Sequence, residues 1–353
     1  MAEIVIDHVT KRFGGFTAVD DLDIRFGDGE VTCLLGPSGC GKTTLMRMIA
    51  GLETPTTGRI LFGNRDVTGL APSVRNVGMV FQYPVMYPTL TVAENIALPL
   101  KSDRGVSSAE AQRRVDEVLD VLGMRGFAGA YIEDLDAGNR QKVAVGRAVA
   151  RHSEIVLFDE PTTNVEVYSK LQLIRAFKEV TTRLKQTIVY VTHDQTEAMT
   201  LADRIALMQA GRIVQCDPPR LLYNDPTTAF GGWFLGNPGM NFVPATLADG
   251  RISAPILIEP LPAPAGTSGD KLTVGIRPEQ VMMTGAPTPG SIAGVLVDQA
   301  VGIAGRFLTK VRVGDIVVKV KTDGRPPARR GETVHLAFPR ERVMLFADGR
   351  RIG

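Results

Sequence analysis

A phosphate-binding loop near the start of the chain limits its possible folds more than any other feature. The loop has the sequence Gly36-Pro37-Ser38-Gly39-Cys40-Gly41-Lys42-Thr43-Thr44. It lies between an apolar segment, Val31 to Leu35, and a helical pattern, Thr43 to Ile49, which is the strand–loop–helix context that the motif requires. Backbone N–H groups in the loop and the positive end of the helix can hold phosphates, with Lys42 reaching the β- and γ-phosphates and Thr43 binding Mg²⁺. The loop predicts nucleotide binding but does not separate a kinase, a GTPase and a motor.

The first part of the chain alternates strand and helix patterns. Met1–Phe26 and Gly58–Val67 alternate in polarity, as antiparallel strands do, and Ser107–Leu122 has the spacing of an exposed amphipathic helix. Three other segments are short, apolar and rich in β-branched residues, which is typical of parallel strands buried on both faces: Val31–Leu35, Ile155–Phe158 and Thr187–Val191. We therefore expect an α/β domain at residues 1–235, with an antiparallel β subdomain and a helical subdomain at about 83–150.

The composition changes from about Pro238 onward. The remaining chain is rich in Gly, Pro and Val, and Pro260–Gly269 is expected to be a loop. Its predicted strands are short: Leu272–Ile276, Gly294–Val297 and Ile316–Val320. Strands of this length favour a small barrel or sandwich. We expect an all-β domain at residues 236–353.

Bulk properties exclude several classes of protein. The net charge of +2 over 353 residues does not favour a nucleic-acid binder. Three cysteines, Cys33, Cys40 and Cys216, are too far apart to suggest a metal site and are typical of a reducing cytosol. We expect no secretory signal and no membrane-spanning segment. If the protein works at a membrane, other chains must span it.

Polar side chains follow the predicted strands. Asp159 and Glu160 follow Ile155–Phe158, so Asp159 can hold Mg²⁺ and Glu160 can orient and deprotonate a water that attacks a γ-phosphate. His193 follows another strand and can hydrogen-bond the γ-phosphate, and Gln82 can sense metal and nucleotide together. Taken singly, each has an ordinary alternative: an acidic surface pair, a structural histidine and an uninformative glutamine. Their joint order after a phosphate loop is the informative feature.

That order resembles the ATPase subunits of ABC transporters along the whole chain. Glu160-Pro161-Thr162-Thr163-Asn164 is similar to the family's Glu-Pro-x-Ser-Asn, and the segment around His193 is similar to its switch region, Val191-Thr192-His193-Asp194-Gln195-Thr196-Glu197-Ala198. The resemblance implies ATP and Mg²⁺ as cofactors, with Thr43, Gln82 and Asp159 at the metal. It also places Phe13 where an aromatic ring stacks on adenine, although a core role for Phe13 is the alternative.

The second half narrows the resemblance. The run from Phe234 to Phe242 is similar to the junction in maltose-type carbohydrate-importer ATPases, and Val274-Gly275-Ile276-Arg277-Pro278-Glu279 resembles a hallmark of their OB-like transport-associated domain. The implied fold is an α/β P-loop ATPase core with antiparallel β and helical subdomains, followed by a C-terminal all-β OB-like domain. A nucleic-acid-binding barrel would need an aromatic and basic platform, and few aromatics occur in this half.

The signature segment departs from the family pattern. In place of Leu-Ser-Gly-Gly-Gln the chain has Leu135-Asp136-Ala137-Gly138-Asn139. In the family this segment, here Asp136 to Gly138, covers the nucleotide held by a second ATPase subunit. A carboxylate about 4 Å from a phosphate charge repels it by roughly 4 kcal/mol at an effective dielectric of 20, whereas a helix cap contributes only about 1 kcal/mol. The alternative is that Asp136 simply caps the next helix.

Because Lys42, Glu160 and His193 are retained, we expect a heterodimer with one strong and one degenerate site. The resemblance implies an ATP-hydrolysing importer subunit for a sugar, polyol or glycerol-type solute. Its partners would be a second, non-identical ATPase, two transmembrane permease subunits contacting Tyr83–Leu100, and an extracytoplasmic solute-binding protein, with no nucleic acid. It would lie peripherally on the cytoplasmic side of the inner membrane. The alternatives are an ATP-binding regulatory subunit with little hydrolysis and a soluble ABC ATPase that is not coupled to transport.

Overall fold

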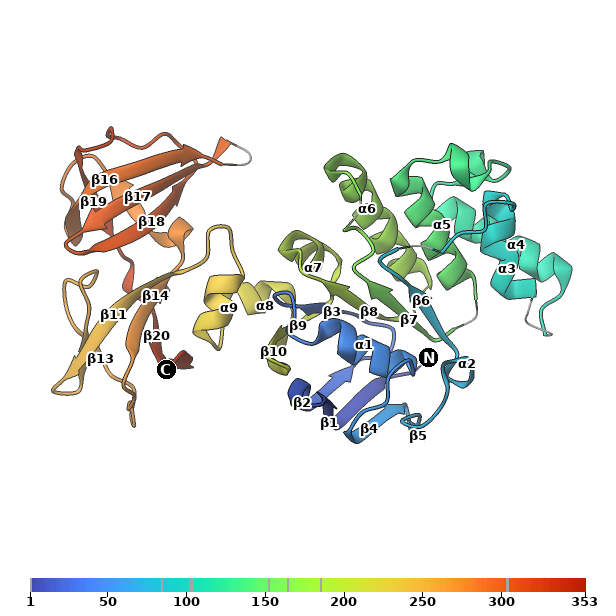
Figure 1. The fold of residues 1–353 in the computed structure, drawn as a ribbon. Coiled ribbons are helices and arrows are strands. Elements are labelled where there is room, and N and C mark those ends of the chain that lie inside the picture. The colour runs from blue at the N-terminus through green and yellow to red at the C-terminus, as the bar shows by residue number, and fades with distance from the viewer. Residues whose placement is uncertain are drawn as a thin grey trace. The chain divides into compact units, whose positions relative to one another are not determined.

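The chain divides into two compact units. The computed structural model describes residues 2–83, 85–101, 105–151, 153–163, 165–184, 186–302 and 305–353. The first unit is Met1–Arg220 and the second is Leu221–Gly353. Figure 1 shows mixed helices and strands in the first unit and mostly strands in the second. Among the described residues, no helix combines the length and the apolar character needed to cross a membrane.

A six-stranded sheet lies at the centre of the first unit. Its strand order is β10-β9-β3-β8-β7-β6. All neighbours are parallel except β10, which is antiparallel to β9. Its strands are β3 Val31–Leu35, β6 Val77–Val80, β7 Ile155–Asp159, β8 Thr187–Thr192, β9 Arg204–Gln209 and β10 Arg212–Asp217. Every residue of β3 and β8 is buried, which confirms the prediction of strands covered on both faces.

A second, antiparallel sheet completes the first unit. Its order is β2-β1-β4-β5. The strands are β1 Ile4–Phe13, β2 Phe16–Phe26, β4 Thr57–Phe62 and β5 Arg65–Asp66. The predicted antiparallel strands are therefore confirmed. Helix α1, Lys42–Ala50, lies between the two sheets in Figure 1, and its Leu45 and Ile49 share one apolar core with both of them. This burial fixes the helix that begins at the phosphate loop.

The remaining helices cover the central sheet and form a helical region. They are α2 Pro72–Arg75, α3 Val92–Lys101, α4 Ser108–Val121, α5 Ala137–Ala150, α6 Val167–Leu184 and α7 Gln195–Leu201. Helix α4 begins after Ser107, whose side chain accepts a hydrogen bond from the Glu110 N–H. One face of α4 buries Val115, Leu119 and its other apolar residues, as the predicted amphipathic helix should.

The second unit is built on two sheets. One has the order β13-β12-β11-β14-β20-β21 and the other β15-β19-β16-β17-β18. The strands are β11 Asn241–Ala248, β12 Arg251–Ser253, β13 Leu261–Pro262, β14 Leu272–Ile276, β15 Met282–Thr284, β16 Ser291–Val301, β17 Phe307–Val313, β18 Ile316–Thr322, β19 Thr333–Ala337, β20 Met344–Ala347 and β21 Arg350–Ile352. Strand β16 is longer than the predicted Gly294–Val297. Its register shifts between Leu296 and Asp298, and this irregularity interrupts the alternation by which the sequence would reveal a strand.

Two short helices, α8 Pro219–Asn224 and α9 Ala229–Phe234, join the second unit rather than the first. Arg277 holds them there. Its guanidinium, 1% exposed, donates to the carbonyls of Tyr223 at 2.6 Å, Gly232 at 2.8 Å and Leu235, and lies 4.0 Å from the centre of the Tyr223 ring. The two compact units divide at 220/221, whereas the domain boundary at 235/236 expected from the sequence stays a prediction. Arg277 acts together with backbone hydrogen bonds from Ala229 to Gly349 and from Arg351 to Thr227, and strand and helix patterns cannot reveal such long-range contacts.

Arg277→Met is expected to destabilise the second unit by about 3 kcal/mol, because three carbonyls lose a charged donor. Calorimetry of the full chain should show a lower melting temperature for this unit and no change in the first. Arg340→Met is the matched control, since Arg340 is exposed and its salt bridge to Glu259 lies at the surface. Equal effects of the two substitutions would contradict the role given to Arg277.

Candidate functional site

The phosphate loop joins β3 to α1, and at two of its glycines there is no room for a side chain. Gly41 has a φ of 105°, and a Cβ on it would lie 2.3 Å from the carbonyl oxygen of Ala18. A Cβ on Gly36 would lie 2.3 Å from the carbonyl oxygen of Met208. Neither position accepts a larger residue, so the loop keeps the tight turn that exposes its N–H groups.

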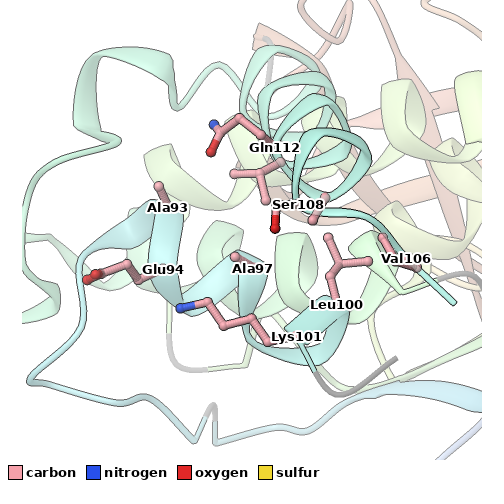
Figure 2. A pocket seen from close by; sticks show the side chains of 10 residues that line it. Ala93, Glu94, Ala97, Leu100, Lys101, Val106, Ser108 and Gln112 are labelled. Atoms are coloured by element: carbon pink, nitrogen blue, oxygen red, sulfur yellow. The ribbon is translucent and has the colours of Figure 1, made fainter. Parts of the chain in front are cut away.

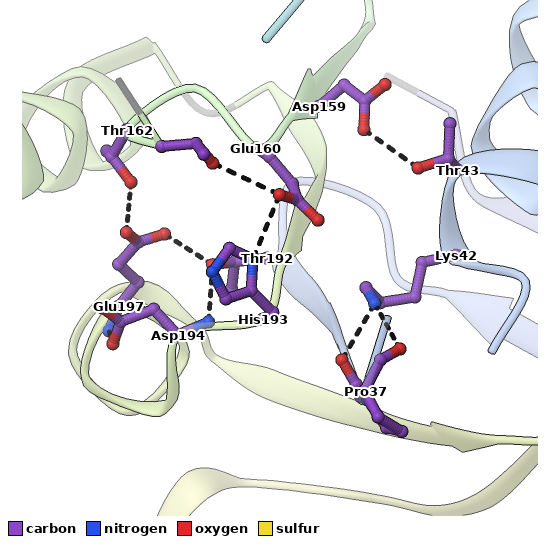
Figure 3. A network of polar contacts seen from close by, with 12 residues as sticks. Pro37, Lys42, Thr43, Asp159, Glu160, Thr162, Thr192, His193, Asp194 and Glu197 are labelled. Atoms are coloured by element: carbon purple, nitrogen blue, oxygen red, sulfur yellow. Dashed lines mark hydrogen bonds and ion pairs between the residues drawn. The ribbon is translucent and has the colours of Figure 1, made fainter. Parts of the chain in front are cut away.

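Lys42 lies buried at the start of α1, and its ammonium group turns back toward the loop. Its Nζ donates to the carbonyl oxygen of Gly36 at 2.8 Å and to that of Pro37 at 3.0 Å (Figure 3). Within the described part of the chain, no carboxylate forms an ion pair with Lys42. Its hydrogen-bond partners among these residues, the two carbonyls and the Cys40 sulfur at 3.8 Å, are neutral, so its positive charge remains available to an anionic ligand.

Oxygen ligands suited to a magnesium ion meet at the end of β7. The Thr43 hydroxyl donates to Asp159 Oδ1 at 3.4 Å. Burial raises the pKa of Asp159, and the neighbouring charge of Glu160 adds to the effect. Gln82 follows β6, the neighbour of β7, so its backbone lies at the same edge of the sheet. A hydroxyl, a carboxylate and an amide oxygen are the hard donors that Mg²⁺ prefers.

Glu160 and His193 lie together at the ends of β7 and β8. The His193 Nδ1 atom is 3.0 Å from Glu160 Oε2, and the Thr163 hydroxyl donates to the same oxygen at 3.2 Å (Figure 3). The Glu160 N–H donates to the carbonyl oxygen of Val191 at 3.0 Å, which ties the two strand ends together. The sequence predicted separate roles for these side chains, whereas the structure shows a direct contact between them. Asn164, the last residue of this motif, lies outside the described residues.

Phe13 ends β1 and is 46% exposed, so it is not a core residue. The Lys11 ammonium lies 4.8 Å from the centre of its ring. An exposed ring beside a cation can stack on a flat heterocycle.

The signature residues come from the helical region rather than from the strand ends. Asp136 is the N-cap of α5: its Oδ1 accepts from the Asn139 N–H at 2.7 Å and its Oδ2 from the Asn139 amide at 3.0 Å. Gly138 is buried in the first turn of the helix. The capping role that the sequence left open is thus present, and it holds the carboxylate at the positive end of α5.

Comparisons with known proteins match this geometry. Residues 19–163 match the ABC transporter family model, residues 236–281 the MalK OB fold domain and residues 274–346 the TOBE domain. The sn-glycerol-3-phosphate import ATP-binding protein UgpC of Chromohalobacter salexigens is 38% identical over 100% of this chain and 96% of its own length. The chain belongs to the ABC transporter ATP-binding proteins. ATP is therefore its substrate, and its activity is ATP hydrolysis coupled to transport.

Two further proteins resemble this ABC ATPase. The diacetylchitobiose uptake system ATP-binding protein MsiK of Streptomyces coelicolor is 38% identical over 99% of this chain and 98% of its own length. Among solved structures, the dimeric structure of MJ0796, a bacterial ABC transporter cassette, is 29% identical with a TM-score of 0.54. It covers 62% of this chain and 99% of the cassette. The predicted α/β ATPase core with a C-terminal OB-like domain is confirmed.

One part of the site in this ABC ATPase was not predicted. Glu197, on α7, is buried and accepts hydrogen bonds from Thr162, Tyr190 and Thr192. Glu197 belongs to the segment around His193 that resembles the family's switch region, but we inferred no role for it from the sequence. The sequence did offer a sign of this polar cluster. Tyr190 and Thr192 are two residues apart in β8, just before His193, so their side chains lie on the same face of the strand.

A cavity of about 470 Å³ lies away from the phosphate loop, between α3 and α4. Figure 2 shows Ala97 and Leu100 on its apolar wall and the charged ends of Glu94 and Lys101 nearby. Another cavity, of about 420 Å³, includes Tyr87 in its lining. The described residues that line both cavities are separate from the phosphate loop and from Asp159, Glu160 and His193.

Proposed function

We propose that this protein is the ATP-hydrolysing subunit of an importer for a sugar, polyol or glycerol-type solute. The observation that supports it most is the edge of the central sheet, where Lys42, Asp159 and the Glu160–His193 pair follow neighbouring strands. The names of relatives that match over the full chain include import of sn-glycerol-3-phosphate and uptake of diacetylchitobiose. Both are polar solutes of the proposed class.

In the proposed mechanism each side chain at the edge has a separate task. Lys42 and the loop N–H groups bind the phosphates, and Phe13 stacks on the adenine ring. Glu160 orients the attacking water and accepts its proton. Because Nδ1 of His193 contacts Glu160, Nε2 is left to hydrogen-bond the γ-phosphate. Mg²⁺, held by Thr43, Asp159 and Gln82, would neutralise phosphate charge.

We also propose that the chain pairs with a second, non-identical ATPase subunit. The MJ0796 cassette is described as dimeric, which supports pairing of cassettes as such. Asp136 supports the non-identical partner, because its capping role keeps a carboxylate at the start of α5. If that helix end faces the nucleotide bound to the partner subunit, the carboxylate weakens the ATP site of the partner. The ATP site on this chain's own phosphate loop keeps its residues.

The permease subunits are proposed to contact the helical region. Phe81, Tyr83, Val85 and Tyr87 are each more than 40% exposed, the most exposed being Tyr83 at 70%. Pro84, in the same predicted contact segment, lies outside the described residues. An exposed aromatic group beside the cavity that Val85 and Tyr87 line suits a protein partner. The proposal includes a peripheral position on the cytoplasmic side of the membrane, with an extracytoplasmic protein delivering the solute.

Deletion of the gene should abolish ATP-dependent uptake of one solute. Cells would be tested with labelled sn-glycerol 3-phosphate and with a disaccharide, because the two classes of relative differ in solute. The wild-type gene should restore uptake, and a Lys42→Ala variant should not, since it lacks the phosphate-binding ammonium. Suppose that uptake of every solute is unchanged and that the permease subunits do not alter the rate of ATP hydrolysis. That result would favour an ABC ATPase that is not coupled to transport. Uptake restored by Lys42→Ala would favour a regulatory subunit.

A further inference from the structure

The carboxylate of Glu197 is buried beneath the strand ends that carry Glu160 and His193. It is 1% exposed, and both of its oxygens have two partners. Oε1 accepts from the Thr162 hydroxyl and lies 2.7 Å from Lys170 Nζ. Oε2 accepts from the Tyr190 hydroxyl at 3.0 Å and from the Thr192 hydroxyl at 2.7 Å. A buried carboxylate with this many donors is a fixed point of the structure.

These partners anchor the two loops of the hydrolysis site. Thr162 belongs to the loop that follows Glu160, and Thr192 immediately precedes His193 (Figure 3). On the other side of His193, Asp194 caps α7 through the Thr196 N–H at 2.7 Å and binds Lys170 Nζ at 2.6 Å. Both neighbours of His193 are therefore held by one network, and Glu197 is its centre.

The network favours the charged form of Lys170 and the protonated form of Tyr190. Burial lowers the pKa of Lys170, but its hydrogen bonds to Asp194 and Glu197 outweigh this effect and leave the pKa raised. Burial, with the nearby charge of Glu197, raises the pKa of Tyr190 well above its ordinary value, so its hydroxyl remains a donor. One anion thus meets one ammonium group and three hydroxyl donors. Neutralising the anion would leave these buried donors poorly satisfied.

We propose that Glu197 is a positioning residue for ATP hydrolysis, which holds Glu160 and His193 at hydrogen-bonding distance by fixing both loops. This inference rests on the roles proposed for Glu160 and His193. Glu197 touches neither nucleotide nor water in this scheme, and it acts through Thr162, Thr192 and the cap of α7. Its effect should therefore be on turnover rather than on binding of ATP.

Glu197→Gln is the first test, in the full chain and in the assembly in which the wild type hydrolyses ATP. We expect kcat to fall by about 10- to 100-fold, because a small displacement of catalytic groups has effects of this size. The KM and the equilibrium dissociation constant for ATP should stay within about twofold. Glu179→Gln is the control, because Glu179 is exposed on α6 and forms a surface ion pair with Arg183, one turn away. A kcat within about twofold of wild type for Glu197→Gln would overturn the proposal.

Two matched pairs of variants separate positioning from packing. Thr162→Ser and Thr192→Ser keep the hydroxyl donor, whereas Thr162→Val and Thr192→Val keep the shape and lose the donor. Positioning predicts nearly normal kcat in both serine variants and a several-fold, roughly 3- to 10-fold, loss in both valine variants. The reverse order would overturn the proposal. These pairs decide the matter even if Glu197→Gln does not fold.

Variants of the hydrolysis residues distinguish this inference from the proposed function. If Glu160→Gln keeps normal turnover, the role proposed for Glu160 fails, whatever Glu197→Gln does. If Glu160→Gln is inactive and Glu197→Gln is normal, only the positioning role fails.

Discussion

Glu160→Gln is expected to reduce ATP turnover at least about 100-fold while ATP binding remains nearly unchanged, because the substitution removes the group that accepts the proton of the attacking water. The glutamine keeps the size of the side chain and can still contact His193. Single-turnover hydrolysis and equilibrium nucleotide binding, measured on the same preparation, separate the two effects.

Glu179→Gln serves again as the control for the chemical change itself, since it alters an exposed carboxylate on α6. A Glu160→Gln protein that hydrolyses ATP at the wild-type rate would show that another group activates the water. Transport that continues at the wild-type rate despite lost hydrolysis in this subunit would instead support the regulatory alternative.

Asp136→Ser is expected to raise ATP hydrolysis by the isolated chain at least about tenfold. At an effective dielectric of 20, two like charges about 4 Å apart repel by roughly 4 kcal/mol, so removing one should favour closure on a second copy. Serine caps a helix about as well as aspartate does, so α5 should keep its stability. The measurement is steady-state hydrolysis as a function of protein concentration.

Asp136→Asn is the matched control, because it keeps the shape and the cap but removes the charge. If charge is the obstacle, both variants gain activity, and the serine variant gains more because its hydroxyl can donate to phosphate. The wild-type chain should then become active when mixed with the ATPase encoded beside it. Full activity of the wild-type chain alone would instead refute the non-identical partner and favour a homodimer.

Much of the ATP site was predictable because its residues are ordered by simple local structure. The phosphate loop requires a strand before it and a helix after it, and β3 and α1 provide both. Asp159 and His193 follow apolar strands, so a parallel sheet brings them to one edge. The pairing of His193 with Glu160 was not predictable, because it depends on how two loops approach each other across β7 and β8.

Features that depend on one buried side chain were also beyond the sequence. Arg277 binds carbonyls of α8 and α9, which lie more than 40 residues before it in the chain. Thr192, one partner of Glu197, lies close to it in the sequence, but its partners Thr162 and Lys170 lie far from it and could not be inferred. The position of Asp136 as a cap was an explicit alternative, since capping depends only on neighbouring residues. Roles that depend on neighbouring residues in the sequence were predictable, whereas polar contacts between residues far apart in the chain were not.

The backbone at Glu160 adds a different kind of support for its role. Its φ of 45° lies in the left-handed region, which costs a residue with a side chain about 1–2 kcal/mol and costs glycine little. A chain selected only for durability would gain by having glycine there. The strained backbone at Glu160 thus lies at a strand end where a carboxylate contacts a histidine. Under the role proposed for Glu160, a glycine at position 160 would relieve the strain but remove the group that activates the water, so engineering for heat resistance should leave this position unchanged.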